Sequence, residues 1–273
     1  MRHGPANRYE DKQGALTMAQ TIAVTGRGGT GKTSFVALAS RFLDTPLLID
    51  ADPDQSLGSM LGVRLEEQDI RTISEMLHDV QKDKVLDEFK SMPLQDKMEY
   101  LLHMSCLYEG EGFDLLSLGV KWTKGCYCQP NNLLRGLIPD LARSYDFTVV
   151  DAPAGLEHLN RRILDSIDHV FAVMDPSSKS VRNVERMKNI SDEVGIELKH
   201  IHLVANHSFP EEKLKALKEV EDADFAGKVA YDEDLVEYDW DGRSLLQLPG
   251  NSPACRSVED ILQNAGCRAP AQA

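Results

Sequence analysis

The sequence predicts an α/β protein with a doubly wound, mainly parallel sheet that is covered by helices on both faces. Two observations lead to this fold class. Short apolar runs, typical of strands, alternate with helical stretches from residue 21 onward. The runs are almost continuously apolar, as expected when both faces of a parallel sheet are covered. Because no repeat or linker interrupts this order, we expect a single domain over residues 18–273, with a mostly helical insertion near 64–107.

The expected elements follow in chain order. Strands are expected at Thr21–Thr25, Pro46–Asp50, Gly112–Leu118, Phe147–Asp151, His169–Asp175 and Lys199–Asn206. Helices are expected at Lys32–Leu43, Ile73–Val80, Val85–Cys106, Asn132–Arg143, Leu156–Asp165, Ser178–Val194, Glu211–Glu221 and Ser257–Asn264. The remaining segments, including the acidic stretch Glu221–Asp241, are expected to be loops and solvated faces.

Composition narrows the class of protein and its partners. The chain has 273 residues and a net charge of −14, which disfavours nucleic acid or an anionic membrane as the main partner. No apolar run approaches the ~20 residues that span a bilayer. Residues 1–17 are polar, so we expect a disordered leader before a native start at Met18. The cysteine count of five favours reduced thiols or metal ligands in a cytoplasmic protein over a disulfide framework.

Residues Gly26–Thr33 form a phosphate-binding motif. They match G-x-x-x-x-G-K-[ST], directly after the first expected strand and at the start of the first expected helix. The glycines let backbone N–H groups turn toward phosphate, and the helix N-terminus adds its positive dipole. Lys32 is expected to reach the β- and γ-phosphates, and the Thr33 hydroxyl to ligate Mg²⁺. We therefore expect ATP to bind at Gly26, Arg27, Gly28, Gly29, Thr30, Gly31, Lys32, Thr33 and Ser34.

Acidic residues follow two of the expected strands. Asp50, Asp52 and Asp54 come at the end of the second strand, where ligands bind in open α/β sheets. One of these carboxylates can hold Mg²⁺ through water and another can orient the attacking water, while a solvated polar turn is the alternative. Asp151 ends a strand of the Walker B form, whose carboxylate holds Mg²⁺. The segment up to Gly155 can rearrange when the γ-phosphate is lost.

Cys126 and Cys128 are separated by one residue. Such a pair can present both sulfurs to one ion but cannot complete a four-ligand site alone. A symmetric dimer would bring two pairs together, and four thiolates suit zinc when tetrahedral and Ni(II) when planar. Two ordinary thiols or a redox-active pair are the alternatives. By contrast, Cys106 is expected in the core, and Cys255 and Cys267 are expected to flank the last helix without a role.

The nucleotide motifs resemble those of the MinD/NifH/ParA class of P-loop ATPases. Gly26–Thr33 resembles the deviant Walker A motif of this class, and residues 49–53 and 150–155 resemble its two switch segments. The resemblance implies that Asp52 activates water and that Asp151 sits behind the magnesium. The signature position, usually a lysine that reaches the partner subunit's nucleotide, is here Arg27, which keeps the charge but has a planar fork.

Asn206 is a further candidate for nucleotide binding. Leu203-Val204-Ala205-Asn206 looks like the strand that ends in an adenine-contacting asparagine in the same class. A capping or turn role is the alternative.

A narrower resemblance covers nearly the whole chain. Residues 125–128, 131–135 and 154–162 look like the CooC family, ATPases that assist nickel insertion into carbon monoxide dehydrogenase. The resemblance implies ATP, Mg²⁺ and Ni²⁺ or Zn²⁺ as ligands, with Cys126 and Cys128 as the metal motif. It also implies a homodimer that depends on nucleotide or metal, and carbon monoxide dehydrogenase as the client.

We therefore expect an ATP-dependent metallochaperone with Arg27, Lys32 and Asp52 as its catalytic residues. Asp151 and Gly155 would link the γ-phosphate to the cysteine segment. An iron–sulfur carrier of the NifH type is one alternative, although that relative uses well-separated cysteines. The other alternative is a positioning switch of the MinD or ParA kind. It would need a basic amphipathic C-terminal helix or a basic face, whereas Ser257–Ala273 has one arginine and two acidic residues.

Overall fold

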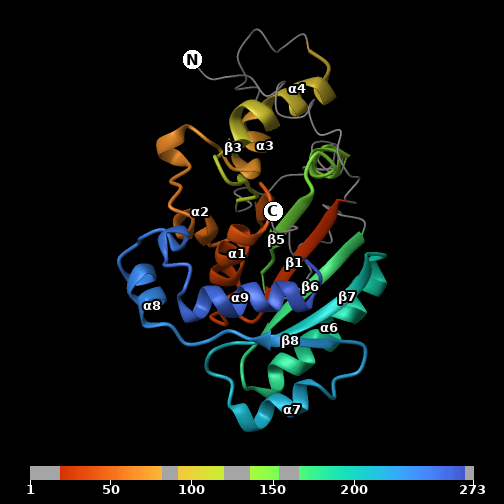
Figure 1. The fold of residues 1–273 in the computed structure, drawn as a ribbon. Coiled ribbons are helices and arrows are strands. Elements are labelled where there is room, and N and C mark those ends of the chain that lie inside the picture. The colour runs from red at the N-terminus through yellow and green to blue at the C-terminus, as the bar shows by residue number, and fades with distance from the viewer. Residues whose placement is uncertain (1–18, 82–91, 120–135, 154–165, 268–273) are drawn as a thin grey trace.

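The computed structural model describes residues 19–81, 92–119, 136–153 and 166–267, and these form an eight-stranded sheet (Figure 1). The strand order is β3-β4-β2-β5-β1-β6-β7-β8, and all neighbours are parallel except β3 and β4. The strands are β1 Gln20–Gly26, β2 Leu47–Asp50, β3 Leu107–Glu109, β4 Asp114–Ser117, β5 Phe147–Asp151, β6 Ser166–Met174, β7 Glu197–Ala205 and β8 Asp224–Lys228. The predicted mainly parallel α/β fold is confirmed.

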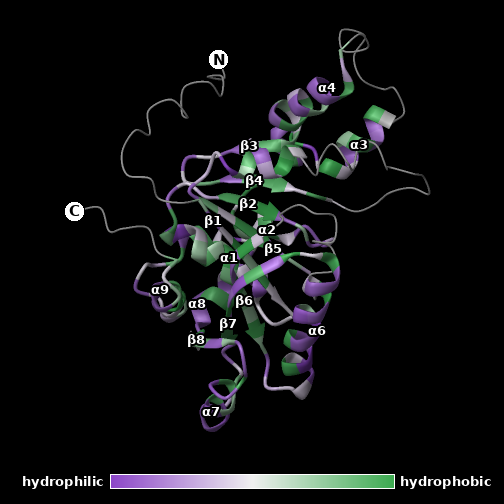
Figure 2. Ribbon diagram, turned by 90° about the vertical axis from the view of Figure 1, so that its right-hand side faces the viewer, coloured by the Kyte–Doolittle hydropathy of each residue, from purple (hydrophilic) through white to green (hydrophobic). Residues whose placement is uncertain are grey.

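Helices cover both faces of the sheet, as Figure 2 shows for α1, α8 and α9 on one side and α6 on the other. The first layer contains α1 (Lys32–Ala39), α2 (Ser56–Met60), α8 (Glu233–Trp240) and α9 (Pro253–Asn264). The second contains α3 (Ile73–Gln81), α4 (Leu94–Leu101), a helix over 136–142, α6 (Ser178–Val194) and the single turn α7 (Leu214–Leu217). Short turns are η2 (Ser40–Phe42), η3 (Glu66–Gln68), η5 (Leu102–Cys106), η7 (Glu211–Lys213) and η8 (Leu245–Gln247).

The strands are apolar on both sides because each side packs against one helical layer. In β1, Ile22 and Val24 belong to the core beneath α1 and α9, whereas Ala23 between them belongs to the core beneath α6. Val149 and Val150 of β5 divide in the same way. This arrangement explains why the strands read as continuous apolar runs.

The order of strands brings the ends of β2, β5 and β1 together. Asp50 and Asp151 are register partners, and Val24 pairs with Asp151 on the other side. The chain passes from β1 to β2 across the position that β5 fills, so the loop after β1 opens at a topological switch point. Ligands bind at such points in open α/β sheets.

Some expected elements were wrong or incomplete. The edge strands β3 and β8 were not predicted, because each is short and only partly buried. The helix expected at Glu211–Glu221 is shorter, with a 3₁₀ turn followed by α7. The last helix begins at Pro253, where the Ser252 hydroxyl caps it, so Cys255 lies inside α9 rather than before it. The helix expected at Val85–Cys106 is described from Leu94 onward, as α4 followed by η5. The parts of predicted helices at 85–91, 132–135 and 156–165 lie outside the described residues.

The cysteines of the described residues are core side chains. Cys106, Cys255 and Cys267 are buried and free. Burial raises the pKa of the Cys106 and Cys267 thiols to about 12, so neither is a thiolate near neutral pH. Among the helices that the structure describes, none is long and apolar enough to cross a membrane.

Candidate nucleotide-binding site

The loop between β1 and α1 needs glycine for two different reasons. Gly26 lies against the carbonyl oxygen of Val173 in β6, and a Cβ at this position would overlap with that oxygen. Gly31 has a φ of 90°, in the left-handed region, where it forms the N-cap of α1. The first helical hydrogen bond follows at once, from the Phe35 N–H to the Gly31 carbonyl oxygen at 2.9 Å. The predicted strand–turn–helix setting of the motif is therefore present.

The N-terminus of α1 has no side-chain cap among the described residues. Its first N–H groups are therefore available to an anion, and the helix dipole favours negative charge at this end. Lys32, the first residue of the helix, is only 6% exposed. Its Nζ lies 3.9 Å from Asp52 Oδ2, so the lysine and the acid predicted to act on water face the same space.

Asp50 and Asp151 place two buried carboxyl groups side by side below this loop. Burial, and then the charge of Asp151, raise the pKa of Asp50 to about 7. Burial raises the pKa of Asp151 to about 6, although the Thr33 hydroxyl and the Lys32 ammonium offset part of the rise. The N–H groups of Asp52 and Leu57 donate to the Asp50 carboxylate at 3.1 and 3.2 Å.

The Asp151 carboxylate is the unusual group of the site. Both of its oxygens are buried, and neither has a partner in hydrogen-bonding geometry within the described part of the chain. A buried, unpaired carboxylate is costly unless a cation or donors satisfy it. Mg²⁺ prefers oxygen ligands and usually keeps several waters. Asp151, with Thr33 beside it, therefore fits the magnesium ion of a nucleotide complex.

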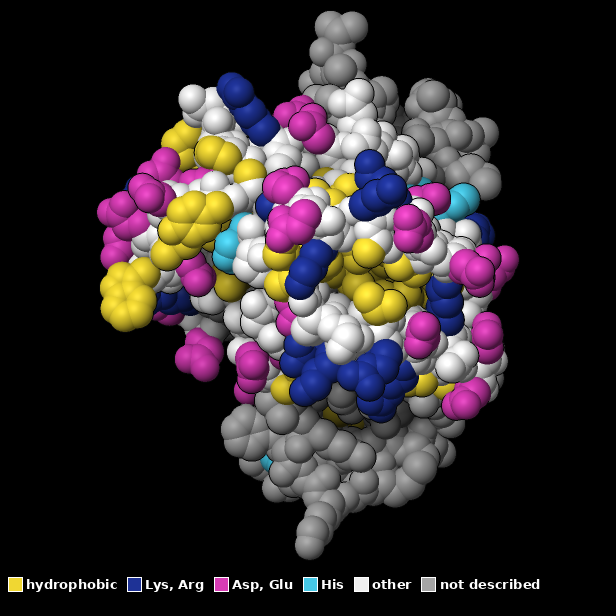
Figure 3. Space-filling view, turned by 90° about the horizontal axis from the view of Figure 1, so that it is seen from below, with side chains coloured by type: hydrophobic (Ala, Val, Ile, Leu, Met, Phe, Trp, Pro, Cys, Tyr) yellow, Lys and Arg dark blue, Asp and Glu magenta, His cyan; other side chains and the backbone are white. Residues whose placement is uncertain are grey.

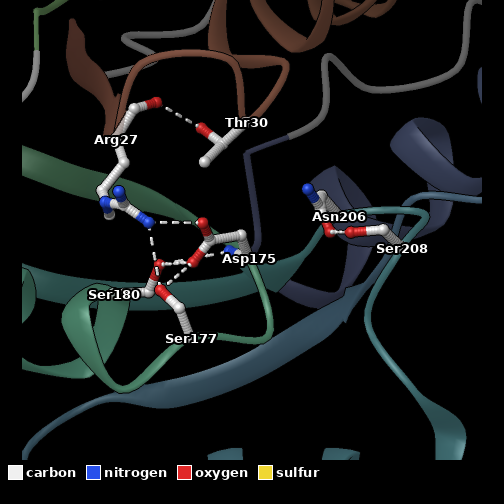
Figure 4. A network of polar contacts seen from close by, with 7 residues as sticks. All are labelled: Arg27, Thr30, Asp175, Ser177, Ser180, Asn206 and Ser208. Atoms are coloured by element: carbon white, nitrogen blue, oxygen red, sulfur yellow. Dashed lines mark hydrogen bonds and ion pairs between the residues drawn. The ribbon is translucent and has the colours of Figure 1, made fainter.

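The signature arginine is held within its own chain. Arg27 Nη1 lies 2.7 Å from Asp175 Oδ2 and donates to Ser177 Oγ at 3.1 Å, and the Ser180 hydroxyl also donates to Asp175 (Figure 4). Burial raises the pKa of Asp175, but the hydroxyls of Ser177 and Ser180, which both donate to its carboxylate, and the charge of Arg27 outweigh this effect and hold the pKa below its usual range. No sequence motif singles out Asp175 as a partner of Arg27. Its position directly after β6, which pairs with β1, was the available signal.

A pocket lies beside the loop, on the side of α1. It is lined by Gly29–Gly31 and Ser34, by Asn206, and by Val229–Asp232 with Leu235 and Val236 of α8. Ser208 donates to Asn206 Oδ1 at 2.8 Å, and Figure 4 shows the amide nitrogen pointing away from Ser208. The Phe209 N–H also donates to the Asn206 carbonyl oxygen, so the residue both lines the pocket and starts a turn. Tyr231, which sequence reasoning missed, packs with its ring tilted against that of His207, with ring centroids 5.7 Å apart.

The metal prediction lies outside the described residues. Cys126 and Cys128 fall in 120–135, and Gly155 falls in 154–165. Within the described residues, no group of three or more His, Cys, Asp or Glu side chains is arranged to hold a metal ion. The described chain approaches Gly155 at Pro153, whose carbonyl oxygen accepts from the Thr25 hydroxyl of β1 at 3.4 Å.

A glycine loop on β1, acids at the ends of β2 and β5, and helices on both faces of a mainly parallel sheet define a P-loop nucleotide-binding protein. The chain belongs to the family described as AAA domain, whose family model matches residues 19–202. An uncharacterised ATP-binding protein of Methanocaldococcus jannaschii is 35% identical over 89% of this chain and 96% of its own length.

Two further comparisons bear on fold and function. The carbon monoxide dehydrogenase accessory protein CooC of Rhodospirillum rubrum is 28% identical over 89% of this chain and 95% of its own length. The septum site-determining protein MinD of Pyrococcus horikoshii, solved with Mg-ADP, superposes with a TM-score of 0.62 at 19% identity. That alignment covers 91% of this chain and 96% of MinD and supports the fold.

Proposed function

We propose that this protein is an ATP-dependent metallochaperone that binds nickel or zinc through Cys126 and Cys128 and assists nickel insertion into a client such as carbon monoxide dehydrogenase. The observation that carries the proposal is a Cys-x-Cys pair on the same chain as a built nucleotide site. The similarity to the Rhodospirillum accessory protein supports it, because it extends over nearly the full length of both chains.

The candidate nucleotide site would supply the residues for cleavage of ATP. The N-terminus of α1 and Lys32 would hold the phosphates, and Thr33 and Asp151 would hold Mg²⁺, which neutralises phosphate charge when bound. Asp52 lies 3.9 Å from Lys32, which would reach the γ-phosphate, and this distance supports Asp52 as the residue that would orient a water beside that phosphorus. The water oxygen bonds to the γ-phosphorus as the bond to the bridging oxygen breaks. ADP and inorganic phosphate leave, and the proton of the water passes to solvent.

Dimerisation would complete the metal site. One chain offers two thiolates, whereas a twofold axis beside the cysteine segment would bring four together. Arg27 would leave Asp175 and reach the nucleotide of the partner when ATP closes the dimer. Because Asp175 and Arg27 form a partly exposed pair, this exchange would cost at most about 1 kcal/mol. Loss of the γ-phosphate would then act through Asp151 and Gly155 on the segment that holds the metal.

Metal content and molecular mass of anaerobically purified protein test this proposal. Wild type and the Cys126→Ala/Cys128→Ala variant would be compared with and without a non-hydrolysable ATP analogue. The proposal predicts about one nickel or zinc ion per dimer in wild type and none in the variant. A variant that still binds the metal stoichiometrically would refute the cysteine site.

Two other results would identify the alternatives. A brown protein with charge-transfer absorption would indicate an iron–sulfur carrier. A metal-free wild type that dimerises with the ATP analogue alone would indicate a nucleotide switch.

A further inference from the structure

Helix α8 presents apolar side chains to solvent beside the nucleotide pocket. Val236 and Trp240 are 51% and 88% exposed and stand one helical turn apart on the same face. Tyr231, which precedes the N-cap residue of the helix, is 56% exposed. The opposite side of the helix packs on the core through Leu235 and Tyr238. Trp240 is therefore not needed to hold α8 in place.

Acidic side chains surround these residues. Between 229 and 242 the chain has no lysine or arginine, and five acids lie on or directly after α8, namely Glu233, Asp234, Glu237, Asp239 and Asp241. Arg243 is the next basic residue, and its guanidinium is stacked 3.5 Å from the Tyr238 ring centroid on the inner side. Figure 3 shows exposed apolar side chains with acidic neighbours on the left, where α8 lies.

We propose that Tyr231, Val236 and Trp240, with their acidic border, form a docking surface (the α8 surface) for a basic segment of a partner protein that carries apolar side chains. Exposing a tryptophan to water is unfavourable, and so is gathering several negative charges around it. A tryptophan in this setting suits the centre of an interface, where a partner covers it. The acidic border attracts lysine and arginine. It repels nucleic acid and anionic membranes. A second copy of the chain, with the same net charge of −14, is a poorer match.

The α8 surface adjoins the pocket beside the glycine loop. Tyr231, Leu235 and Val236 line the pocket that also contacts Gly29–Gly31. A segment bound across Val236 and Trp240 therefore shares a wall with the nucleotide pocket. Docking at the α8 surface does not require metal binding by the cysteines.

Binding of a synthetic amphipathic peptide to the full-length, nucleotide-free protein tests this surface. The probe is a short lysine–leucine peptide with leucines at helical spacing, and its glutamate–leucine counterpart is the control peptide. Fluorescence anisotropy of the labelled peptide gives the affinity. In a Trp122→Phe background Trp240 is the single tryptophan, so its emission reports contact directly. We expect binding of the basic peptide alone, with a blue shift of Trp240 emission.

Matched variants separate docking from general attraction to an acidic protein. Trp240→Ser and Glu233→Gln/Glu237→Gln should each weaken peptide binding about tenfold at low salt. Met104→Ser removes another exposed apolar side chain, and Asp192→Asn/Glu193→Gln removes two exposed charges from α6; both should leave the affinity unchanged. Equal binding by all variants would overturn the proposal. So would a Trp240→Ser variant that alters the mass of the protein in solution but not its peptide affinity, because the surface would then belong to a second copy.

Discussion

Replacing Asp151 with asparagine should stabilise the nucleotide-free protein and at the same time remove its stabilisation by Mg²⁺ and nucleotide. The pKa of this carboxyl rises from 3.8 in the unfolded chain to about 6 in the folded protein. The folded state thus holds the proton more tightly, so stability is lost as the pH rises from 4 to about 6. This difference of roughly two pKa units lowers the free energy of unfolding by about 3 kcal/mol above pH 6.

The Asp151→Asn variant would recover only part of this lost stability. Its amide would still be buried without a partner, at about 1–2 kcal/mol. We therefore expect a net gain of about 1–2 kcal/mol, or roughly 2–6 °C in Tm, at pH 8 and no gain at pH 4. With nucleotide at 100 times its Kd, binding stabilises a protein by about 2.7 kcal/mol. The share of this stabilisation that requires Mg²⁺ should disappear in the variant.

Differential scanning fluorimetry at the two pH values, with and without Mg²⁺ and ATP analogue, measures both effects. Asp168→Asn is the matched control, because its expected change in stability has the opposite sign. Although burial raises the pKa of Asp168, hydrogen bonds from Lys199 and Thr21 hold it below its usual range, so this variant should lose stability. The reasoning about Asp151 would be refuted by a nucleotide-free Asp151→Asn protein that is less stable than wild type at pH 8. Undiminished stabilisation by Mg²⁺ would equally contradict its role.

Three other predictions concern the loop, the lysine and a buried histidine. Gly26→Ala should lower the free energy of unfolding, measured in urea, by more than about 2 kcal/mol, because the alanine Cβ would overlap with a carbonyl oxygen of β6. Gly28→Ala is the control and should be nearly neutral, because a Cβ at that position meets open space. Lys32→Ala should weaken binding of a fluorescent ATP analogue by about 100-fold or more, while its circular dichroism spectrum stays unchanged. An affinity equal to that of wild type would show that Lys32 does not bind the nucleotide. Burial, and then the charge of His169, lower the pKa of His202 to about 4. As the pH drops, this imidazole is therefore protonated in the unfolded chain before it is protonated in the folded protein. The stability of the fold should thus fall as the pH drops from 6.5 toward 4. Tm measured against pH should therefore fall less steeply for His202→Gln than for wild type, and parallel curves would exclude this origin.

The sequence predicts the parts of this fold whose physical requirements are local. The loop from Gly26 to Thr33 could be located to the residue, since its glycines and its flanking strand and helix are adjacent in the chain. The same holds for Asp50 and Asp151, because each ends a buried strand and parallel strands end at a common edge. Their proximity as register partners follows from the topology.

Other features depend on contacts between distant segments and left weaker signals. The ion pair of Arg27 joins residues 148 positions apart in the chain. Tyr231 lines the pocket only because β8 adds to the edge of the sheet, and β8 is too short and too mixed in polarity to be identified by its pattern. The early start of α9 was visible in the Ser252-Pro253 pair, a serine N-cap followed by proline at the first helical position.

Release of nickel on addition of ATP tests the central claim most directly. Nickel-loaded, full-length protein would be mixed with Mg²⁺ and either ATP or a non-hydrolysable analogue in the presence of a colorimetric chelator. Coupling of the nucleotide site to Cys126 and Cys128 predicts that nickel reaches the chelator with ATP, stays bound with the analogue, and stays bound in Lys32→Ala with either nucleotide. Release at the same rate in all four cases would contradict the account, because metal binding would then be independent of ATP hydrolysis.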